Sequence, residues 1–413
     1  MTISRGLIAL ALLFVVVACG TTPAASSPSP QPASSSTPVS AQSPATTGIA
    51  SQAGGWTELR WSSPVATPEQ GSLFDVVIWR DAYVAVGQAS VQSQYVGAAF
   101  VSADGVHWER TAAFSVSPGR LVVTNTRLIA LGVRADDPRG TRTSVVAWTS
   151  RDGRAWQPEA GLAISDASIT QAVARGDTVV AVGSNAGGAP AMWRSVDSGA
   201  WQRVPPPSSN IVLRSVVTVT DGFLAAGRDG EPDQSSGGVG TPGVGRPAAW
   251  WSADGLTWSP VQVEGAPAAG AQLLEILRIA TGYVALGSDA TNPSENPRSP
   301  QLWVSADAHD WRLVGPPPHW PGALESNGKQ AIILGVARAS DGTTTTAAWV
   351  SVDGRQWSQL SFGGDLVSVP VPVSEAGGRQ PNFDRFFAEP NGILVLGQQR
   401  GDLSTWFAEA VVH

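Results

Sequence analysis

One short string recurs six times along this chain of 413 residues and constrains its fold more than any other feature. Each copy has a serine, an aspartate two places later, and a tryptophan four places after the aspartate. The copies occupy residues 102–108, 150–156, 195–201, 252–258, 305–311 and 351–357, at intervals of 45 to 57 residues. Self-similarity with a period of this length is typical of a repeat architecture, in which each repeat is one small structural unit.

A second pattern runs in phase with the first and has seven copies. Each is a short run of Val, Ile, Leu and Ala that closes on a glycine: Gly87, Gly132, Gly183, Gly227, Gly287, Gly335 and Gly397. Runs of this length between turn residues predict strands that are buried on both faces. An apolar stretch such as residues 74–79 and a tight polar turn precede each run, so we interpret the pair as a hairpin.

A third strand is predicted before each serine, because an aromatic residue stands two places ahead of it. These aromatic residues are Phe100, Trp148, Trp193, Trp250, Trp303 and Trp349. The Ser-x-Asp turn then reverses the chain, and its tryptophan opens a fourth strand. Four antiparallel strands in each repeat predict an all-β chain, with residues 56–413 forming a seven-bladed β-propeller.

Seven glycine-ended runs and six serine-aspartate-tryptophan strings leave the last repeat short of one strand. Trp406 occupies the place of the third-strand aromatic residue, and the sequence ends at His413. We expect the N-terminal strand to complete this last blade and to close the ring, so that no sheet edge stays open there. Two registers are possible, one beginning at Trp56 and the other at Trp61.

The repeated aspartates and tryptophans are predicted to be structural. An aspartate in such a turn can accept hydrogen bonds from backbone N–H groups, and the tryptophan can bury its ring between neighbouring sheets. These residues are Asp104, Trp108, Asp152, Trp156, Asp197, Trp201, Asp254, Trp258, Asp307, Trp311, Asp353 and Trp357. The alternative is that some of the tryptophan rings bind sugar.

The string resembles the Asp-box, also called the bacterial neuraminidase repeat, of sialidases and other β-propellers. Every copy here is one residue shorter than the usual Asp-box. The resemblance implies a propeller and places these turns away from the catalytic face, so it says little about function. Sialidases also use an arginine triad with an Arg-Ile-Pro type motif and a tyrosine nucleophile, but this chain has no Arg-Ile-Pro, and only Tyr95 is a tyrosine in a predicted loop.

We therefore predict no catalytic residue. A glycosidase with paired carboxylates would have to draw them from the predicted loops, which offer Asp136, Asp137, Glu231, Asp233, Asp289 and Glu295. We also predict no cofactor and no metal site. The four histidines (His107, His309, His319 and His413) lack the spacing of metal ligands, and the glycine-rich segment 238–243 contains a proline and precedes no predicted helix. The net charge of −7, with no basic stripe, predicts no nucleic-acid partner.

The N-terminus predicts export and anchoring. Residues 1–18 combine Arg5 with an apolar stretch from 7 to 17, which is typical of a signal peptide and too short to span a membrane. Residues 16–19 resemble a bacterial lipobox, which implies lipidation of Cys19, the only cysteine in the chain. The segment up to residue 55 is rich in Ser, Pro, Thr and Ala and is predicted to be a disordered tether. We expect a monomer anchored by this lipid to the outer face of a bacterial cell membrane.

Binding residues are expected where the repeat varies in length. From each glycine to the next serine the distance varies between 12 and 25 residues, with the longest inserts at 133–142, 228–246 and 288–298. Long connections also occur at 315–321 and 358–382. In a propeller these connections share one face, and loops on a rigid scaffold are frequent binding sites. The candidates are Arg134, Asp136, Arg139, Asp233, Glu295, Arg298 and Trp320. The alternative is that the inserts are length variation without function.

These inferences together predict a non-catalytic binding or scaffold module for an unknown protein or glycan partner. A sialidase-like glycoside hydrolase that acts on cell-envelope or extracellular glycans is the first alternative. An assembly or stability factor for a membrane complex is the second.

Overall fold

The computed structural model describes residues 55–138, 142–185, 187–197, 199–236, 239–241, 243–265, 268–289, 299–318, 321–338, 344–364, 371–372, 382–399 and 402–412. The chain divides into residues 1–52, which lie outside the described residues, and a second unit of residues 53–413. In the described part, the regular structure is strand apart from one 3₁₀ turn, η1 (Ala160–Leu162). The prediction of an all-β chain is confirmed. No helix in the described residues is long and apolar enough to cross a membrane.

Most strands belong to antiparallel four-stranded repeats that follow one another along the chain. The first three repeats are β2 (Val65–Trp79), β3 (Ala82–Val91), β4 (Gln94–Ser102) and β5 (Glu109–Phe114); β6 (Pro118–Val123), β7 (Leu128–Ala135), β8 (Thr143–Ser150) and β9 (Gln157–Pro158); and β10 (Ala167–Arg175), β11 (Thr178–Asn185), β12 (Pro190–Val196) and β13 (Gln202–Val204). The next three are β14 (Ile211–Val219), β15 (Gly222–Gly230), β18 (Val244–Ser252) and β19 (Ser259–Pro260); β22 (Gln272–Ile279), β23 (Gly282–Asp289), β24 (Ser299–Ser305) and β25 (Asp310–Gly315); and β26 (Pro321–Ser326), β27 (Ala331–Arg338), β28 (Thr344–Ser351) and β29 (Ser358–Gly364).

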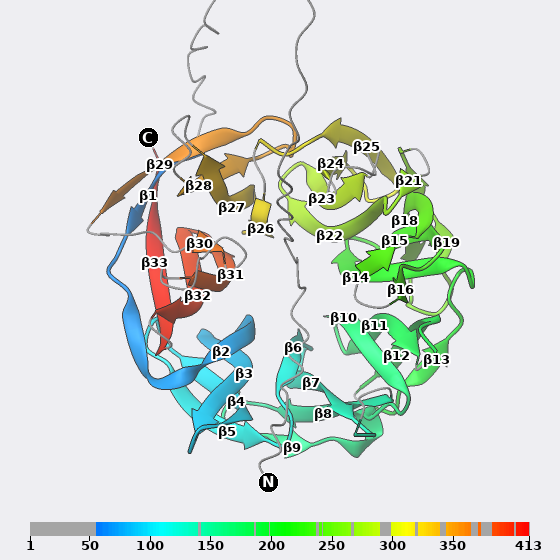
Figure 1. The fold of residues 1–413 in the computed structure, drawn as a ribbon, viewed down its shortest axis with the longest axis horizontal. Coiled ribbons are helices and arrows are strands. Elements are labelled where there is room, and N and C mark those ends of the chain that lie inside the picture. Colours follow the sequence, from blue (N-terminus) through cyan, green and yellow to red (C-terminus); the bar gives the residue numbers. More distant parts are fainter. Residues whose placement is uncertain are drawn as a thin grey trace, which may run out of the picture. The chain divides into compact units, whose positions relative to one another are not determined.

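The remaining strands are the last repeat, the N-terminal strand and short additions. They are β31 (Asn382–Glu389), β32 (Gly392–Gln399), β33 (Asp402–Val412), β1 (Trp56–Trp61), β16 (Gln234–Ser236), β17 (Val239–Thr241), β20 (Gln262–Val263), β21 (Ala268–Ala269) and β30 (Val371–Pro372). In Figure 1 the repeats follow one another around a common centre, and the first strand of each repeat lies nearest to it. We call these seven strands, β2, β6, β10, β14, β22, β26 and β31, the inner strands.

The glycine that closes each apolar run lies inside its strand and not at its end. Gly87, for example, lies in the middle of β3 and pairs with Leu73 of β2. Immediately after the paired residue the inner strand shifts register by a β-bulge, and the same shift occurs in all seven inner strands. At Gly87, Gly183, Gly227 and Gly287 a side chain would collide with the inner strand next to the bulge; a β-carbon on Gly227, for example, would lie 1.8 Å from the Val212 carbonyl oxygen. In these four repeats the glycine therefore makes room for the bulged strand.

The apolar cores lie between consecutive repeats. Each of seven clusters of buried side chains combines residues from two neighbouring repeats, among them the last and the first. Each inner strand also contacts the next, in the order β2, β6, β10, β14, β22, β26, β31 and again β2. Every blade-like repeat thus buries both of its faces, which explains why the second strands are apolar on both sides.

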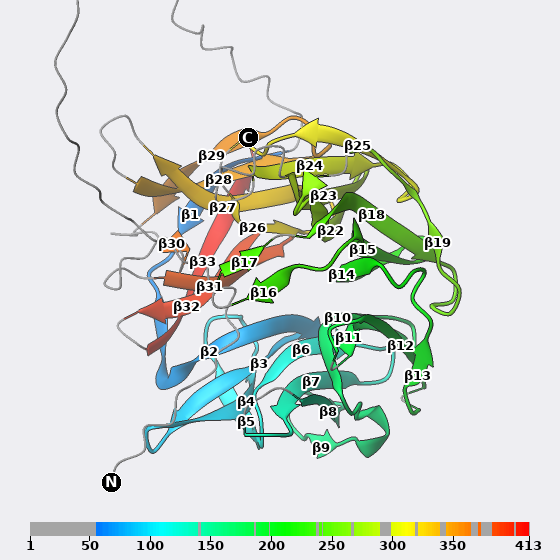
Figure 2. The ribbon, with the colours of Figure 1, turned by 45° about the vertical axis from the view of Figure 1, so that its right-hand side comes forward.

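The N-terminal strand β1 pairs antiparallel with β33 and parallel with β29, and it lies beside β33 in both Figure 1 and Figure 2. Trp61 stands opposite Ala408, two places after Trp406. In the first repeat Phe100 pairs with Arg110, two places after Trp108. Because the strands are antiparallel, this register sets Trp108 against the position two places after Phe100, just as Trp61 is set against the position two places after Trp406. Of the two alternatives left open by the sequence, the pairing therefore matches Trp61. Beyond it, β2 continues along β33, with Val65 opposite Thr405.

Candidate functional site

The repeated turns hold their aspartates in a net of local hydrogen bonds. Asp152 Oδ1 accepts hydrogen bonds from the backbone N–H groups of Arg154 and Ala155, both at 2.8 Å, and from Ser150 Oγ at 3.0 Å. These backbone hydrogen bonds lower the pKa of Asp152. The same arrangement occurs at Asp104, Asp254, Asp307 and Asp353. The carboxylates in these five turns are engaged with their own backbone.

The third turn departs from this pattern. Among the described residues, the Asp197 carboxylate accepts no hydrogen bond from its own turn, and Ser195 Oγ donates to the Gly199 carbonyl oxygen at 2.6 Å. The residue after the aspartate has a positive φ in the other copies, such as 74° at Gly153. In the third copy the glycine comes one place later, and Asp197 itself takes a φ of 52°. Within the residues that the structure describes, the hydrogen bonds from backbone N–H groups to the turn aspartate therefore occur in five of the six turns.

The turn tryptophans lie in the cores between repeats. Trp108, Trp258 and Trp311 are buried, and Trp156, Trp201 and Trp357 are half-buried against neighbouring clusters. Two tyrosines contact these rings, with centroid distances of 6.5 Å for Tyr83–Trp108 and 6.4 Å for Tyr283–Trp311. Tyr95, the tyrosine expected in a loop, lies at the tip of the β3–β4 hairpin and is 53% exposed.

The second repeat's insert contains an ion pair between Arg134 and Asp136. Arg134 Nη2 lies 3.3 Å from Asp136 Oδ1, and Ser144 Oγ donates to Asp136 Oδ2. The hydrogen bond from Ser144 and the nearby Arg134 guanidinium lower the pKa of Asp136. Arg134 and Asp136 are therefore paired with each other at the end of β7, and Ser144 of β8 contacts the carboxylate from across the hairpin.

Asp233 is also engaged inside the protein. Its carboxylate accepts hydrogen bonds from Arg228 Nη2 at 2.9 Å, Arg214 Nη2 at 2.8 Å and the Gly243 N–H at 3.0 Å. Arg228 is fully buried, with an exposed fraction of 0%. Burial alone would raise the pKa of Asp233, but the Gly243 hydrogen bond and the Arg228 guanidinium lower it. Asp233 thus fastens the insert of the fourth repeat to the protein body.

Several predicted positions lie outside the described residues. They are the signal peptide 1–18, Cys19, the tether up to residue 54, Arg139, Glu295, Arg298 and Trp320. The insert face is consequently described only in part, and its described charged candidates are internally paired.

A different group of charged side chains comes together on the inner strands. Asp75, Arg120, Glu275 and Arg385 each stand directly after the bulge of an inner strand. Glu325 lies farther along β26 and interacts electrostatically with Asp75, Glu275 and Arg385. The charges of Arg120 and Arg385 both act on Glu275, and Arg385 Nη1 lies 3.6 Å from Asp75 Oδ1. We call these five residues the central cluster.

Part of this arrangement satisfies backbone groups of neighbouring inner strands. Asp75 Oδ2 accepts a hydrogen bond from the Leu121 N–H at 2.8 Å, and Arg120 Nε donates to the Thr170 carbonyl oxygen at 3.2 Å. Beyond the bulge, β2 and β6 pair on one side only, with β3 and β7, so the other side of each strand has backbone groups without a ladder partner. Asp75 and Arg120 therefore connect neighbouring repeats by hydrogen bonds, and they also contribute charges to the central cluster.

The two glutamates of the central cluster are the most perturbed acids on the inner strands. Burial raises the pKa of Glu275 to about 7, although Arg385 and Arg120 oppose the shift. Burial also raises the pKa of Glu325 to about 8, and the neighbouring Glu275 charge adds to the effect. Burial likewise lowers the pKa of Arg120. Carboxyl groups of this kind keep a proton near neutral pH and can donate a hydrogen bond or act as an acid.

These pKa values predict that stability falls as the pH rises. The folded protein binds more protons than the unfolded chain between about pH 4.5, the ordinary value of glutamate, and pH 8. The contribution of these two glutamates to stability is therefore fully present below pH 4.5. It declines as the pH rises above this value and is lost once the pH has passed 7 to 8. Glu325→Gln, which resembles the protonated acid, should flatten this decline when urea unfolding is measured from pH 5 to 9. The exposed Glu409→Gln should leave the slope unchanged, and equal slopes in all three proteins would contradict the assignment.

The central cluster was not predicted from the sequence, because functional carboxylates were expected in the loops. Glu275 lies within the apolar segment 272–279, and Asp75 and Arg385 lie in similar surroundings. The available signal was a charged residue inside an otherwise apolar inner strand, two places after the residue that pairs with the repeated glycine. The described loop acids Asp136 and Asp233 remain in their own ion pairs instead of joining this group.

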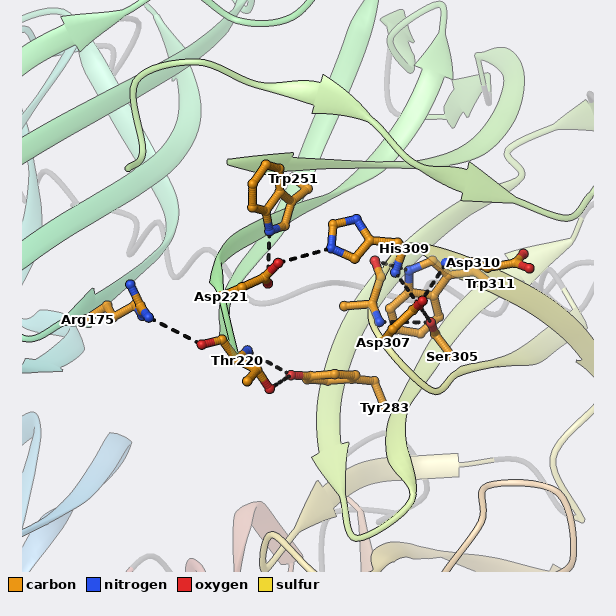
Figure 3. A network of polar contacts seen from close by, with 11 residues as sticks. Arg175, Thr220, Asp221, Trp251, Tyr283, Ser305, Asp307, His309, Asp310 and Trp311 are labelled. Carbon is orange, nitrogen blue, oxygen red and sulfur yellow. Dashed lines mark hydrogen bonds and ion pairs between the residues drawn. The ribbon is translucent and has the colours of Figure 1, made fainter. Parts of the chain in front are cut away.

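A second polar network joins the fourth and fifth repeats (Figure 3). Asp221 Oδ1 accepts a hydrogen bond from Trp251 Nε1 at 3.1 Å, and Asp221 Oδ2 lies 3.3 Å from His309 Nε2. The Trp251 and His309 rings are 5.3 Å apart. His309 therefore takes part in a contact between repeats. In the part of the chain that the structure describes, no three His, Cys, Asp or Glu side chains are grouped closely enough to hold a metal ion.

No family model matches the chain, and no curated protein matches it. Similar solved structures are β-propellers and glycoside hydrolase or lyase folds. The β-propeller domain of the Trilobed protease from Pyrococcus furiosus is 9% identical, the match covering 83% of this chain and 96% of that one, with a TM-score of 0.46. Acylaminoacyl peptidase from Pyrococcus horikoshii is 8% identical over 83% of this chain and 52% of that one, with a TM-score of 0.48. An ulvan lyase is 10% identical over 86% and 95%, with a TM-score of 0.47. These scores carry no argument about function.

Proposed function

We propose that the protein is a lipid-anchored, extracytoplasmic, seven-bladed β-propeller that binds a glycan at its central cluster without catalysis. Seven blades in a closed ring are supported by the cyclic contacts of the inner strands and by seven cores between repeats. Closure by the N-terminal strand is supported by the pairing of Trp61 with Ala408. Export and anchoring rest on the signal-like segment 1–18 and the lipobox-like residues 16–19.

The observation that carries the binding proposal is the convergence of five charged side chains from five inner strands. Guanidiniums donate hydrogen bonds, ionised carboxylates accept them, and a protonated carboxyl does both. Sugar hydroxyls need this mixture, because each of them is a donor and an acceptor. A protein partner would favour an apolar core in its interface, whereas the described exposed apolar side chains include dispersed residues such as Tyr95 on β4 and Leu274 on β22.

Glycoside hydrolysis is the second candidate, and the raised pKa values of Glu275 and Glu325 favour it. A carboxyl that stays protonated near neutral pH is the form that a general acid needs, and the Asp75 carboxyl group could act beside it. This hydrolase would draw its acids from the inner strands.

The two functions can be separated with one set of variants of the full chain. Binding of soluble neutral and uronate-containing cell-envelope oligosaccharides to the full chain should be measured by calorimetry. We expect at least one of these oligosaccharides to bind. Arg385→Gln should weaken its binding about tenfold or more, because hydrogen bonds to a charged group are lost. Arg134→Gln, which alters only the insert pair, should leave binding unchanged.

A fluorogenic glycoside panel should be run with the same proteins. Turnover by the unaltered chain that disappears in Glu275→Gln or Glu325→Gln would replace the binding proposal by hydrolysis. Equal glycan binding by the unaltered chain and Arg385→Gln would contradict a ligand site at the central cluster.

A further inference from the structure

An ion pair connects the first two repeats next to a Ser-x-Asp turn, and the same two positions can be compared in the other repeats. Glu109 follows the turn tryptophan Trp108, and Arg154 is the fifth residue of the next turn. Arg154 Nη1 donates to Glu109 Oε2 at 2.7 Å. Where a turn has arginine at this place, the preceding repeat can thus provide a carboxylate for it.

The fifth and sixth repeats have arginine at both of these positions. Arg312 follows Trp311 as Glu109 follows Trp108, and Arg355 corresponds to Arg154 in the next turn. The other consecutive turns pair Gln157 with Gly199, Gln202 with Leu256 and Ser259 with His309. Only here does the sequence replace the carboxylate by a second guanidinium.

A pocket of about 270 Å³ occupies this place, and Asp307, Asp310, Arg312 and Arg355 contribute to its lining. Arg312 Nη2 donates to Asp310 Oδ2 at 2.7 Å, which leaves its other nitrogens available. The Arg355 side chain makes no hydrogen bond or ion pair within the described residues. Asp307 uses Oδ1 for its own turn. The pocket therefore offers guanidinium donors beside carboxylate acceptors.

We infer that this pocket binds a carboxylated sugar, with the sugar carboxylate between Arg312 and Arg355, so that it pairs with Arg355 as Glu109 pairs with Arg154. Arginine recognises carboxylates through paired hydrogen bonds. A uronic acid has one carboxylate and several hydroxyls, and the hydroxyls suit Asp307 and Asp310 as acceptors. A peptide of glutamates has carboxylates for the two arginines but no hydroxyl groups for these aspartates. The inference rests on the proposed glycan function and names an acidic class of ligand at a second, separate site.

Tri-galacturonate is the probe that tests this inference, with its methyl ester as the uncharged counterpart. Calorimetry with the full chain should show at least tenfold tighter binding of the acid than of the ester. Arg355→Gln should weaken acid binding about tenfold or more. Arg312→Glu recreates the Glu–Arg pair of the first two repeats, so it should abolish binding while the protein keeps its melting temperature. Arg154→Gln, the matched control, should bind as the unaltered chain does.

Four results would overturn the inference: no binding of tri-galacturonate by the unaltered chain, equal affinity for acid and ester, full affinity in both pocket variants, or equally tight binding of a hexaglutamate peptide. The central cluster is tested separately by Arg385→Gln. If binding is lost in Arg385→Gln and retained in Arg355→Gln, the proposed function stands and this pocket is not the site. Loss only in the pocket variants supports the pocket as a second site, and the central cluster is then judged by the oligosaccharide panel with Arg385→Gln.

Discussion

Gly227→Ala is expected to lower the free energy of unfolding by about 3 kcal/mol, because the added methyl group has no space at a repeated bulge. A β-carbon at this position would lie 1.8 Å from the Val212 carbonyl oxygen and 2.9 Å from its carbonyl carbon. Both atoms belong to the backbone, so no side-chain rotation can relieve the collision. The variant must shift β14 away from β15 or lose the bulge, and either change disturbs the pairing on which the repeat depends.

Two other glycines provide graded controls for urea unfolding followed by circular dichroism. Gly132 occupies the same position in the second repeat, but its β-carbon would meet Ser117, Trp148 and Val116 atoms only at 3.3 Å. Gly132→Ala should therefore be destabilised less than Gly227→Ala. A β-carbon on Gly119 meets nothing within 4 Å, so Gly119→Ala should change stability little. Equal loss in all three variants would show that the bulge is not the cause.

Trp311→Ala is expected to cost about 3–5 kcal/mol, since it removes a large ring from a closed core. The ring is 0% exposed, and it lies among buried residues of the fourth and fifth repeats, including Leu224 and Ala285. Its Nε1 donates a hydrogen bond to the Ala308 carbonyl oxygen at 3.0 Å. The variant therefore leaves a cavity and an unpaired carbonyl group between two repeats.

Trp311→Phe separates these two effects, because it keeps most of the ring volume and removes the N–H donor. We expect its loss of stability to be clearly smaller than that of Trp311→Ala in the same unfolding measurement. Leu256→Ala, at a residue that is 36% exposed in the preceding turn, should change stability little. If Trp311→Ala were as mild as Leu256→Ala, the turn tryptophan would not be a core residue.

The turns were predictable from sequence because their interactions are local. Asp152 and the N–H groups it accepts from lie within three residues of each other, so the string itself specifies the contact. The one departure, at Asp197, also has a local cause, since the glycine in that copy has moved by one place. The position of Gly87 inside β3 was harder to foresee, because its reason is a bulge in the partner strand β2.

The central cluster was beyond the sequence interpretation because its members are far apart in the chain and differ in type. Asp75 and Arg385 are separated by more than three hundred residues, yet they form an ion pair at 3.6 Å. The residue after the bulge is an acid in two repeats, an arginine in two others, and Gln171, Ser215 or Ala323 in the remaining three. A position whose side chain changes from repeat to repeat leaves no periodic pattern. The raised pKa of Glu275 depends on burial, which is a property of the assembled inner strands.

The sequence by itself determined the all-β class, the four-stranded repeat and the aspartate turns, because strand period and turn chemistry act over a few residues. It left the choice between Trp56 and Trp61 open, since both fit a strand that begins with tryptophan. Tertiary structure decided that choice through the pairing of Trp61 with Ala408. It also decided which charges meet, because the neighbours of Glu275 and Arg355 come from other repeats. Long-range pairing, and not local pattern, therefore positions both candidate sites.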